Sequence, residues 1–531
     1  MFPGFMRARH TLGTVLLVAG LCELATAQQV PRTAAGKPNL QGIWQVRGDA
    51  AYDLQDHAAR KGAPAAKSVV DGGTIPYQPW AVAKKAANFS KRATEDPLGQ
   101  CYLPGVPRIM YMQYPFQIFQ TPEHVAIAFE WSSVHRLIYT DGKPPLHDVV
   151  DAWMGDSRGR WEGDTLVVDV KGHNDKTWFD MAGNFHSDQM GLVERYTMQD
   201  ADTIRYEVTV NDPKVFTKSW KMSVPLVRQK AMKRLLEYEC DAEAQEASGD
   251  FERDPRTWYP KPGSPPSPLG KPGEMTPGVT LPPVKAGTSL KRAADGKPDL
   301  TGYYQSGGGG ANYGLERHGR DFLTPATRGV VIDPADGSLP YLPWARAERI
   351  NRELPYRGYD DPTAHCFVAG VPRSMYTPSP IQILQTPQYV VLLFERMSWR
   401  IIPLDGRPHI ADNIRLWQGD SVGHWEGDTL VVDTTNMNGK TWLNEVGDVV
   451  SYAEHIVERF TPLDGNKINY RATVTDPIPY SRPWTIEIPM NGQPEELLEV
   501  ACHEDNGDLL HLKDVRDEYR AQQKAAQKKE K

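Results

Sequence analysis

The same series of segments occurs twice along the chain, in the same order, and this duplication limits the fold more than any other feature of the 531 residues. The segment GKPNLQGIWQ at Gly36 returns as GKPDLTGYYQ at Gly296. Likewise GVPRIMY at Gly105 returns as GVPRSMY at Gly370. Because the order is kept over a period of about 260 residues, the sequence predicts a tandem duplication of a whole domain and not an array of short repeats.

A segment rich in proline and glycine separates the two copies, running as PKPGSPPSPLGKPGEMTPGVTLPP from Pro260 to Pro283. Such a composition excludes a helix or an interior strand and is typical of an extended linker. Each copy is long enough to bury a core of its own, and we call the two copies the first and second lobes. The predicted divisions are a signal peptide (1–27), the first lobe (28–259), the linker (260–285), the second lobe (286–512) and a charged C-terminal tail (513–531).

The N-terminus has the order of a secretory signal. Arg7 and Arg9 precede a mostly apolar run over residues 12–24, and Ala25-Thr26-Ala27 follows as an A-x-A cleavage signal. The run is too short for a permanent bilayer span, and the mean hydropathy of the chain is -0.52. The sequence therefore predicts an exported protein, periplasmic or secreted, without a membrane span.

The cysteines follow the duplication. Cys101 aligns with Cys366 and Cys240 with Cys502, so each lobe holds one pair after removal of the signal. In an oxidising compartment we expect the disulfides Cys101–Cys240 and Cys366–Cys502. Each would close a long loop and stabilise the fold by about 4 to 5 kcal/mol in the chain-entropy model. Pairing across the lobes is the alternative.

Hydrophobic periodicity indicates β structure in both lobes. In TIRYEVTV at Thr203 and KINYRATV at Lys467, apolar and polar residues alternate, which is typical of strands with one wet face. Helical patterns are few, chiefly over 81–92 and 345–353. A sheet of many antiparallel strands loses its edges by closing. We therefore predict a mainly β chain with two tandem antiparallel β-barrel domains and few short helices, with a sandwich as the alternative.

The segment NLQGIWQ, with Gly42 and Trp44 at the start of the first predicted strand, resembles the G-x-W opening of lipocalin-like (calycin-type) proteins. In that family the tryptophan closes one end of the barrel, and the second lobe departs from the pattern with Tyr304. The repeated GDSxGxWEGDTLVVD also resembles a group of uncharacterised secreted bacterial proteins. These resemblances imply export and tandem lipocalin-like lobes, and they imply no particular reaction.

The repeated motif contains G-x-S-x-G at Ser157 and at Ser421, the pattern that presents a nucleophilic serine in α/β-hydrolases. A nucleophile elbow needs a helix directly after the serine, whereas a turn at Gly163-Asp164 and a strand over 165–170 follow here. We therefore interpret the motif as two successive hairpins with Asp156 and Ser157 in the first bend. The sequence argues against a serine hydrolase.

The net charge of -7 gives no basic excess for a nucleic-acid groove. The chain carries no nucleotide or flavin motif, and its histidines lack the H-x-H or H-x-x-x-H spacing of a metal site. The sequence thus predicts a protein that binds a small molecule and needs no cofactor, metal or nucleic acid. It does not indicate the oligomeric state.

Histidines that occur in the first lobe alone are the candidates for chemistry. They are His135, His147, His173 and His186, opposite a gap, Ala411, Met437 and Val450 in the second lobe. An imidazole beside a carboxylate suits acid–base chemistry near neutral pH, so His186 and Asp188 are the first catalytic candidates, followed by His135 and Glu130. Histidines in surface loops are the alternative interpretation.

Residues near the shared motifs are the candidates for ligand binding. Pockets for organic ligands are mostly apolar with a few fixed polar groups, and aromatic side chains gather around these motifs. A structural ion pair is the alternative role for the charged members. The predicted ligand-binding residues are Arg108, Arg136, Lys176, Trp178 and Tyr111.

Together these observations predict an exported two-lobed β-barrel protein that binds a small, partly apolar organic molecule inside at least one barrel. An enzyme is favoured, in the form of a cofactor-independent lyase, isomerase or hydrolase with its chemistry in the first lobe. The alternative is a non-catalytic periplasmic binding or scavenging protein, and a structural envelope protein is the third possibility.

Overall fold

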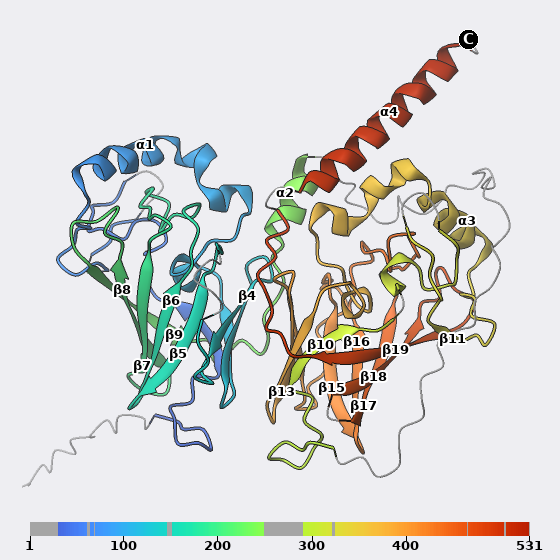
Figure 1. Ribbon diagram of the computed structural model, residues 1–531, viewed down its shortest axis with the longest axis horizontal. Coiled ribbons are helices and arrows are strands. Elements are labelled where there is room, and N and C mark those ends of the chain that lie inside the picture. Colours follow the sequence, from blue (N-terminus) through green and yellow to red (C-terminus); the bar gives the residue numbers. More distant parts are fainter. Residues whose placement is uncertain are drawn as a thin grey trace, which may run out of the picture.

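The computed structural model describes residues 30–60, 64–67, 69–145, 151–248, 290–308, 310–320, 324–464, 466–503 and 506–529. The predicted signal peptide and linker lie outside these residues. Within them the chain is mainly β, and its two barrel-shaped sheets lie side by side with a few helices around them (Figure 1). The predicted fold class is therefore confirmed.

The first sheet is a closed barrel. Its first strand, β1 (Gly42–Val46), pairs antiparallel with both β2 (Phe116–Gln120) and β9 (Trp220–Arg228), which removes every edge. All other neighbours are antiparallel except β4 and β5, which run parallel and share only two residue pairs, a junction that we call the seam. The remaining strands are β3 (His124–Phe129), β4 (His135–Tyr139), β5 (Asp156–Glu162), β6 (Thr165–Lys171), β7 (Gly191–Met198) and β8 (Thr203–Asn211).

The second sheet repeats this order and is nearly closed. Its path runs from β14 (Trp399–Pro403) to β15 (Asp420–Glu426), the two strands that correspond to the seam of the first barrel, and these two ends are not paired with each other. A short strand, β11 (Val331–Asp333), adds to β19 off this path. The other strands are β10 (Gly302–Ser306), β12 (Ile381–Gln385), β13 (Tyr389–Phe394), β16 (Thr429–Thr435), β17 (His455–Asp464), β18 (Lys467–Thr475) and β19 (Trp484–Gln493).

The repeated serine motif forms the start of a strand in each lobe. Ser157 lies in β5 and Ser421 in β15, and each strand forms a single hairpin with the strand that follows it. The prediction of two hairpins with the serine in a bend is therefore wrong. The prediction that no helix follows the serine is confirmed. Each hydroxyl oxygen accepts two N–H groups of one buried arginine, Arg136 at 3.1 and 2.9 Å and Arg400 at 3.0 and 2.9 Å.

The interiors of both barrels are filled by side chains of alternating strand residues. Trp44 of β1 is fully buried, donates its indole N–H to the carbonyl of Leu40 at 2.8 Å and lies under the guanidinium of Arg228. Tyr304 takes the corresponding place in β10 and is also buried.

In the described part of the chain, four α-helices lie outside the sheets. The predicted helices are confirmed as α1 (Pro79–Glu95) and α3 (Pro343–Arg352), each with proline in its first turn, where no backbone N–H is needed. The charged C-terminus forms α4 (Gly507–Lys529), which begins before the predicted tail and projects away from the second lobe (Figure 1). Helix α2 (Cys240–Ser248) lies between the lobes in Figure 1.

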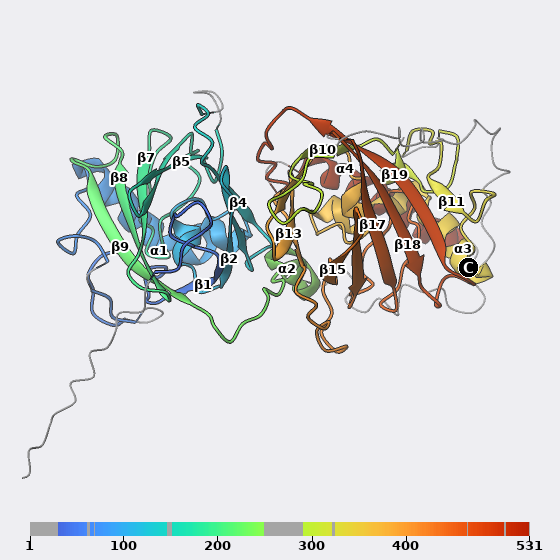
Figure 2. The same cartoon turned by 90° about the horizontal axis from the view of Figure 1, so that it is seen from below.

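The two barrels meet through strands β2 to β4 of the first lobe and β12 to β14 of the second. Figure 2 shows β4 and β13 facing each other across this contact. An apolar cluster drawn from both lobes fills this contact, with Phe119, Ala126 and Leu393 among its members. Trp399 donates its indole N–H across the contact to the carbonyl of Phe129 at 2.9 Å. The lobes therefore share an apolar interface.

After its last barrel strand, each lobe sends a segment onto the other lobe. We call residues 229–239 the first strap and residues 494–501 the second strap. Glu237 of the first strap accepts the backbone N–H groups of Trp417 and Gln418, the latter at 3.1 Å. Glu499 of the second strap accepts those of Trp153 and Met154 at 2.7 and 2.9 Å. This reciprocal contact between equivalent surfaces is the signature of an approximate two-fold relation between the lobes.

Both straps end at a disulfide. Cys101 bonds to Cys240 and Cys366 to Cys502, with Cα atoms 5.6 Å apart in each pair, so the predicted pairing within each lobe is confirmed. Two disulfides indicate an oxidising environment. In the described part of the chain, no helix has the length and apolar character needed to cross a bilayer.

Candidate functional site

A cavity of about 90 Å³ lies between the lobes, and equivalent residues of both lobes line it. Both disulfides border it, followed in each lobe by an aromatic side chain, Tyr102 and Phe367. Trp153 and Met397 add further apolar surface. We call this space the axial cavity because its lining follows the two-fold relation of the lobes. Cavities at domain junctions with mostly apolar walls and a few polar groups are typical of small-molecule sites.

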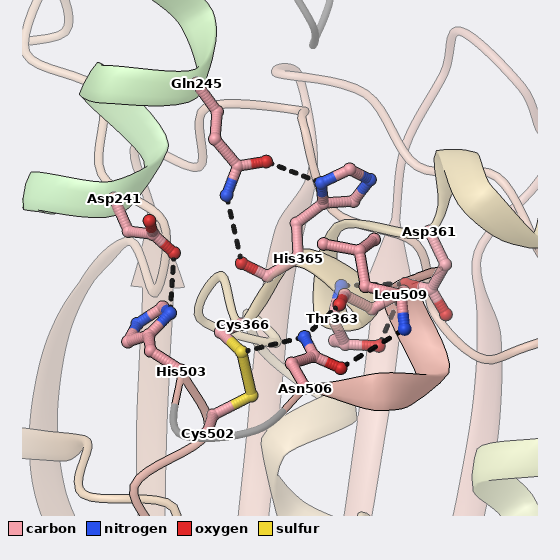
Figure 3. The surroundings of a disulfide bond; sticks show 11 residues. Asp241, Gln245, Asp361, Thr363, His365, Cys366, Cys502, His503, Asn506 and Leu509 are labelled. Atoms are coloured by element: carbon pink, nitrogen blue, oxygen red, sulfur yellow. Dashed lines mark hydrogen bonds and ion pairs between the residues drawn. A yellow bond between two sulfur atoms is a disulfide. The ribbon is translucent and has the colours of Figure 1, made fainter. Parts of the chain in front are cut away.

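An ion pair between equivalent positions crosses the axial cavity. Asp241 directly follows Cys240 and His503 directly follows Cys502, so the duplication places them at matching positions. The His503 Nδ1 atom lies 2.9 Å from the Asp241 carboxylate, which Figure 3 shows beside the Cys366–Cys502 disulfide.

Glu239 is the second titratable group of the axial cavity. Burial raises its pKa to about 7, while the hydrogen bond from the Ser133 hydroxyl and the charge of His503 act in the opposite direction. Ala501 occupies the matching position in the second strap, so the duplication supplies only one carboxyl here. A carboxyl with a pKa near 7 can act as an acid or as a base at neutral pH.

The axial cavity thus combines apolar walls with a carboxyl and an imidazole–carboxylate pair. Groups of this kind can remove a proton from one atom of a bound molecule and return it to another. Among the described residues no group of three or more histidine, cysteine or acidic side chains is arranged to hold a metal ion.

Both straps border the axial cavity, and the protonation of the carboxyls that anchor them depends on pH. Burial raises the pKa of Glu237 to about 8 and that of Glu499 to about 7, although the backbone N–H groups that each one accepts lower it. The folded protein therefore holds these protons more tightly than the unfolded chain. Stability from these groups is complete below the unfolded pKa and is lost as the pH rises through 7 to 8.

We expect the double variant Glu237→Gln and Glu499→Gln to lose less stability than the parent between pH 5 and pH 8. Each amide keeps an oxygen acceptor and has no proton to lose. The difference should be about 1 to 2 kcal/mol, because both side chains are partly accessible to solvent. Urea unfolding at pH 5 and at pH 8 measures the free energy of unfolding of both proteins. An equal change of that free energy with pH in the two proteins would contradict the assignment.

The leading catalytic pair predicted from sequence is not brought together. His186 is buried, with Nε2 2.6 Å from the Thr177 hydroxyl and Nδ1 3.0 Å from the Ser187 carbonyl oxygen. Burial lowers its pKa. Asp188 instead points to solvent and forms an ion pair with Lys214 at 3.0 Å. The surface-loop interpretation of His186 is therefore wrong, and the contacts of His186 and Asp188 go to different partners. The catalytic role of the pair stays a prediction.

His135 and Glu130 both lie at the contact between the lobes. His135 is buried, and burial lowers its pKa to about 4. Its register in β4 makes it the counterpart of Trp399 in β14, which corrects the predicted gap. Glu130 accepts the backbone N–H of Leu236 in the first strap at 3.0 Å, as Glu395 does for Leu498 at 3.4 Å, so it holds a strap in place.

Two of the predicted ligand-binding arginines form buried ion pairs. Arg108 binds both carboxylate oxygens of Asp96 at 2.7 Å. Arg136 points into the first barrel, where it binds Glu194 and donates to the Tyr196 hydroxyl at 3.1 Å. These contacts agree with the alternative interpretation that both arginines form structural ion pairs.

Each of the other three predicted ligand-binding residues contacts a different partner. Tyr111 is buried and donates its hydroxyl to the Phe179 carbonyl at 2.8 Å. Trp178 is buried, and its backbone forms an isolated antiparallel β-bridge with that of Phe185. Lys176 places its ammonium 5.6 Å from the ring of Trp153, a lining residue of the axial cavity.

Sequence reasoning missed Glu239, Asp241 and His503. A signal was present, because all three flank the duplicated cysteines and differ between the lobes. His147 lies outside the described residues. A comparison with family models and with curated proteins found no match to the chain.

Proposed function

We propose that the protein binds a small, largely apolar organic molecule in the axial cavity and moves a proton on it without a cofactor, as a lyase, isomerase or hydrolase does. The observation that carries this proposal is Glu239, a carboxyl with a pKa of about 7, lining the same apolar cavity as the His503–Asp241 pair. We also propose export after cleavage behind Ala27, with residues 260–285 as the linker, in keeping with the two disulfides.

In this proposal Glu239 is the base and the His503–Asp241 pair orients or supplies the second proton. Apolar walls favour a ring or chain of carbon atoms and weaken the hydration of the carboxylate, which makes it a stronger base. Tyr102, Trp153 and Phe367 offer flat surfaces for such a molecule.

The variant Glu239→Gln should lose at least about 100-fold in the rate of proton abstraction, because the amide cannot accept the proton. The probe is 5-nitrobenzisoxazole: the base removes its carbon-bound hydrogen, the N–O bond breaks, and a coloured cyanonitrophenolate forms. The parent rate should rise with pH around 7, as the carboxylate forms.

The matched control is Glu518→Gln, which removes the same charge from an exposed position on α4 and should leave the rate unchanged. Equal rates for the parent and Glu239→Gln would rule out Glu239 as the base. Quenching of tryptophan fluorescence by the probe without turnover would favour the second candidate function.

The second candidate is a non-catalytic binding protein. The Asp241–His503 pair favours it, because an ion pair that joins α2 to the residue after Cys502 also holds the two lobes together. Under this alternative, Asp241→Asn weakens retention of the probe and no variant changes a rate.

A further inference from the structure

A second cavity, of about 100 Å³, lies on the outer face of the first barrel beside its seam. His135, Leu137 and Tyr139 alternate along β4 and so face the same side, toward this space. Met154 lines it from the chain before β5, and Leu497 of the second strap covers it. We call it the seam cavity. It is separate from the axial cavity apart from Met397, which lines both.

His135 contributes an unused hydrogen-bond acceptor to the seam cavity. The ring is about 5% exposed, and Nδ1 has no hydrogen-bond partner in the described part of the chain. Backbone carbonyls of Met397 and Ser398 oppose the lowering of its pKa by burial. In the tautomer that carries its proton on Nε2, Nδ1 keeps a lone pair that can accept a hydrogen bond.

The charged groups around the seam cavity are already compensated. Arg158 binds Asp156 at 2.8 Å and Glu496 at 3.0 Å, and Glu499 accepts two backbone N–H groups. A charged ligand would lose its hydration without gaining an unpaired opposite charge. The chemistry of the space therefore suits a neutral molecule.

The second lobe provides a reference for what the same place looks like when filled. There Trp399 stands where His135 does, its indole N–H is used by the Phe129 carbonyl, and the equivalent cavity is about 40 Å³. The strap side chain Arg234 also occupies that side, paired with Asp420. The smaller ring of His135 thus coincides with a larger cavity and with an unpartnered acceptor.

We propose that the seam cavity is a second binding site, for a neutral molecule of about the size of phenol with an apolar body and one hydroxyl that donates to Nδ1 of His135. Leu137, Met154 and Leu497 contact the body of the ligand. The site does not depend on proton transfer in the axial cavity.

The test is a titration of the full chain, with ¹³C-labelled methionine methyl groups observed by NMR, using phenol and its methyl ether anisole. Phenol should shift the Met154 methyl signal in a saturable way and bind about 3- to 10-fold more tightly than anisole, which cannot donate a hydrogen bond. The variant Glu239→Gln should leave this titration unchanged, so that a failure of the axial site does not affect the outcome.

Two variants of His135 decide the assignment. His135→Trp copies the second lobe and should abolish the Met154 response, because the indole fills the space. His135→Phe keeps the ring without the acceptor and should bind phenol and anisole equally, which guards against a folding defect in the tryptophan variant. Equal affinities for both probes in the parent would overturn the proposal. So would a Met154 shift that does not saturate, which is the result expected of a cavity that holds only water.

Discussion

Replacing Cys366 and Cys502 together with serine should lower the free energy of unfolding of the second lobe by about 4 to 5 kcal/mol. The disulfide closes a loop between residues separated by 136 positions, so its loss frees a large part of the unfolded chain. It also releases the end of the second strap, which carries Glu499, together with His503 directly after Cys502. Urea unfolding followed by intrinsic fluorescence measures the change.

The matching variant in the first lobe, with Cys101 and Cys240 replaced by serine, is the natural control, because its loop spans 139 positions. The two losses should agree within about 1 kcal/mol, since loop entropy depends only weakly on length. A loss below about 1 kcal/mol in either variant would show that the packing of the straps alone holds the loop ends together.

The variant Arg400→Met should destabilise the second lobe by about 3 to 5 kcal/mol. Arg400 and Glu458 are both buried inside the barrel, joined by two hydrogen bonds, one of them 2.8 Å long. Removing the cation leaves a carboxylate that has the hydroxyls of Tyr470 and Thr434 as neighbours but no opposite charge. Thermal and urea unfolding report the loss.

Arg459, which lies in β17 directly after Glu458, is the matched control for this experiment. Its guanidinium is exposed and pairs with Glu426, so Arg459→Met should cost no more than about 0.5 kcal/mol. Adding Glu458→Gln to Arg400→Met should restore part of the stability, because the remaining side chain is neutral. A double variant no more stable than the single one would contradict the role assigned to the unpaired charge.

Strands with strict alternation were predictable from sequence. The segments at Thr203 and Lys467 became β8 and β18, because alternation of apolar and polar residues leaves only one way to bury one face. Ser157 was harder, since Gly155-Asp156-Ser157 has the composition of a turn. Its hydroxyl instead accepts N–H groups of Arg136, a residue distant in sequence, and its backbone pairs with Val170 of β6.

The candidate site could be predicted only in part. A ligand inside a barrel was expected because charged residues are shared by both lobes. Such residues, Arg136 among them, instead form ion pairs in the barrel interior. The axial cavity arises only when the two lobes meet, and no pattern within one lobe indicates which surfaces do so. His135 shows the same limit, because its counterpart Trp399 became visible only through strand register.

The position of Asp241 opposite His503 has a consequence for how such a chain can acquire chemistry. In a dimer of identical subunits, any residue on the symmetry axis meets its own copy, so a histidine can face only a histidine and an aspartate only an aspartate. Fusing the two genes removes that restriction, and each half can then mutate alone. An acid can come to face a base across the junction, which makes the point of former symmetry the place where unlike groups first become available to one substrate.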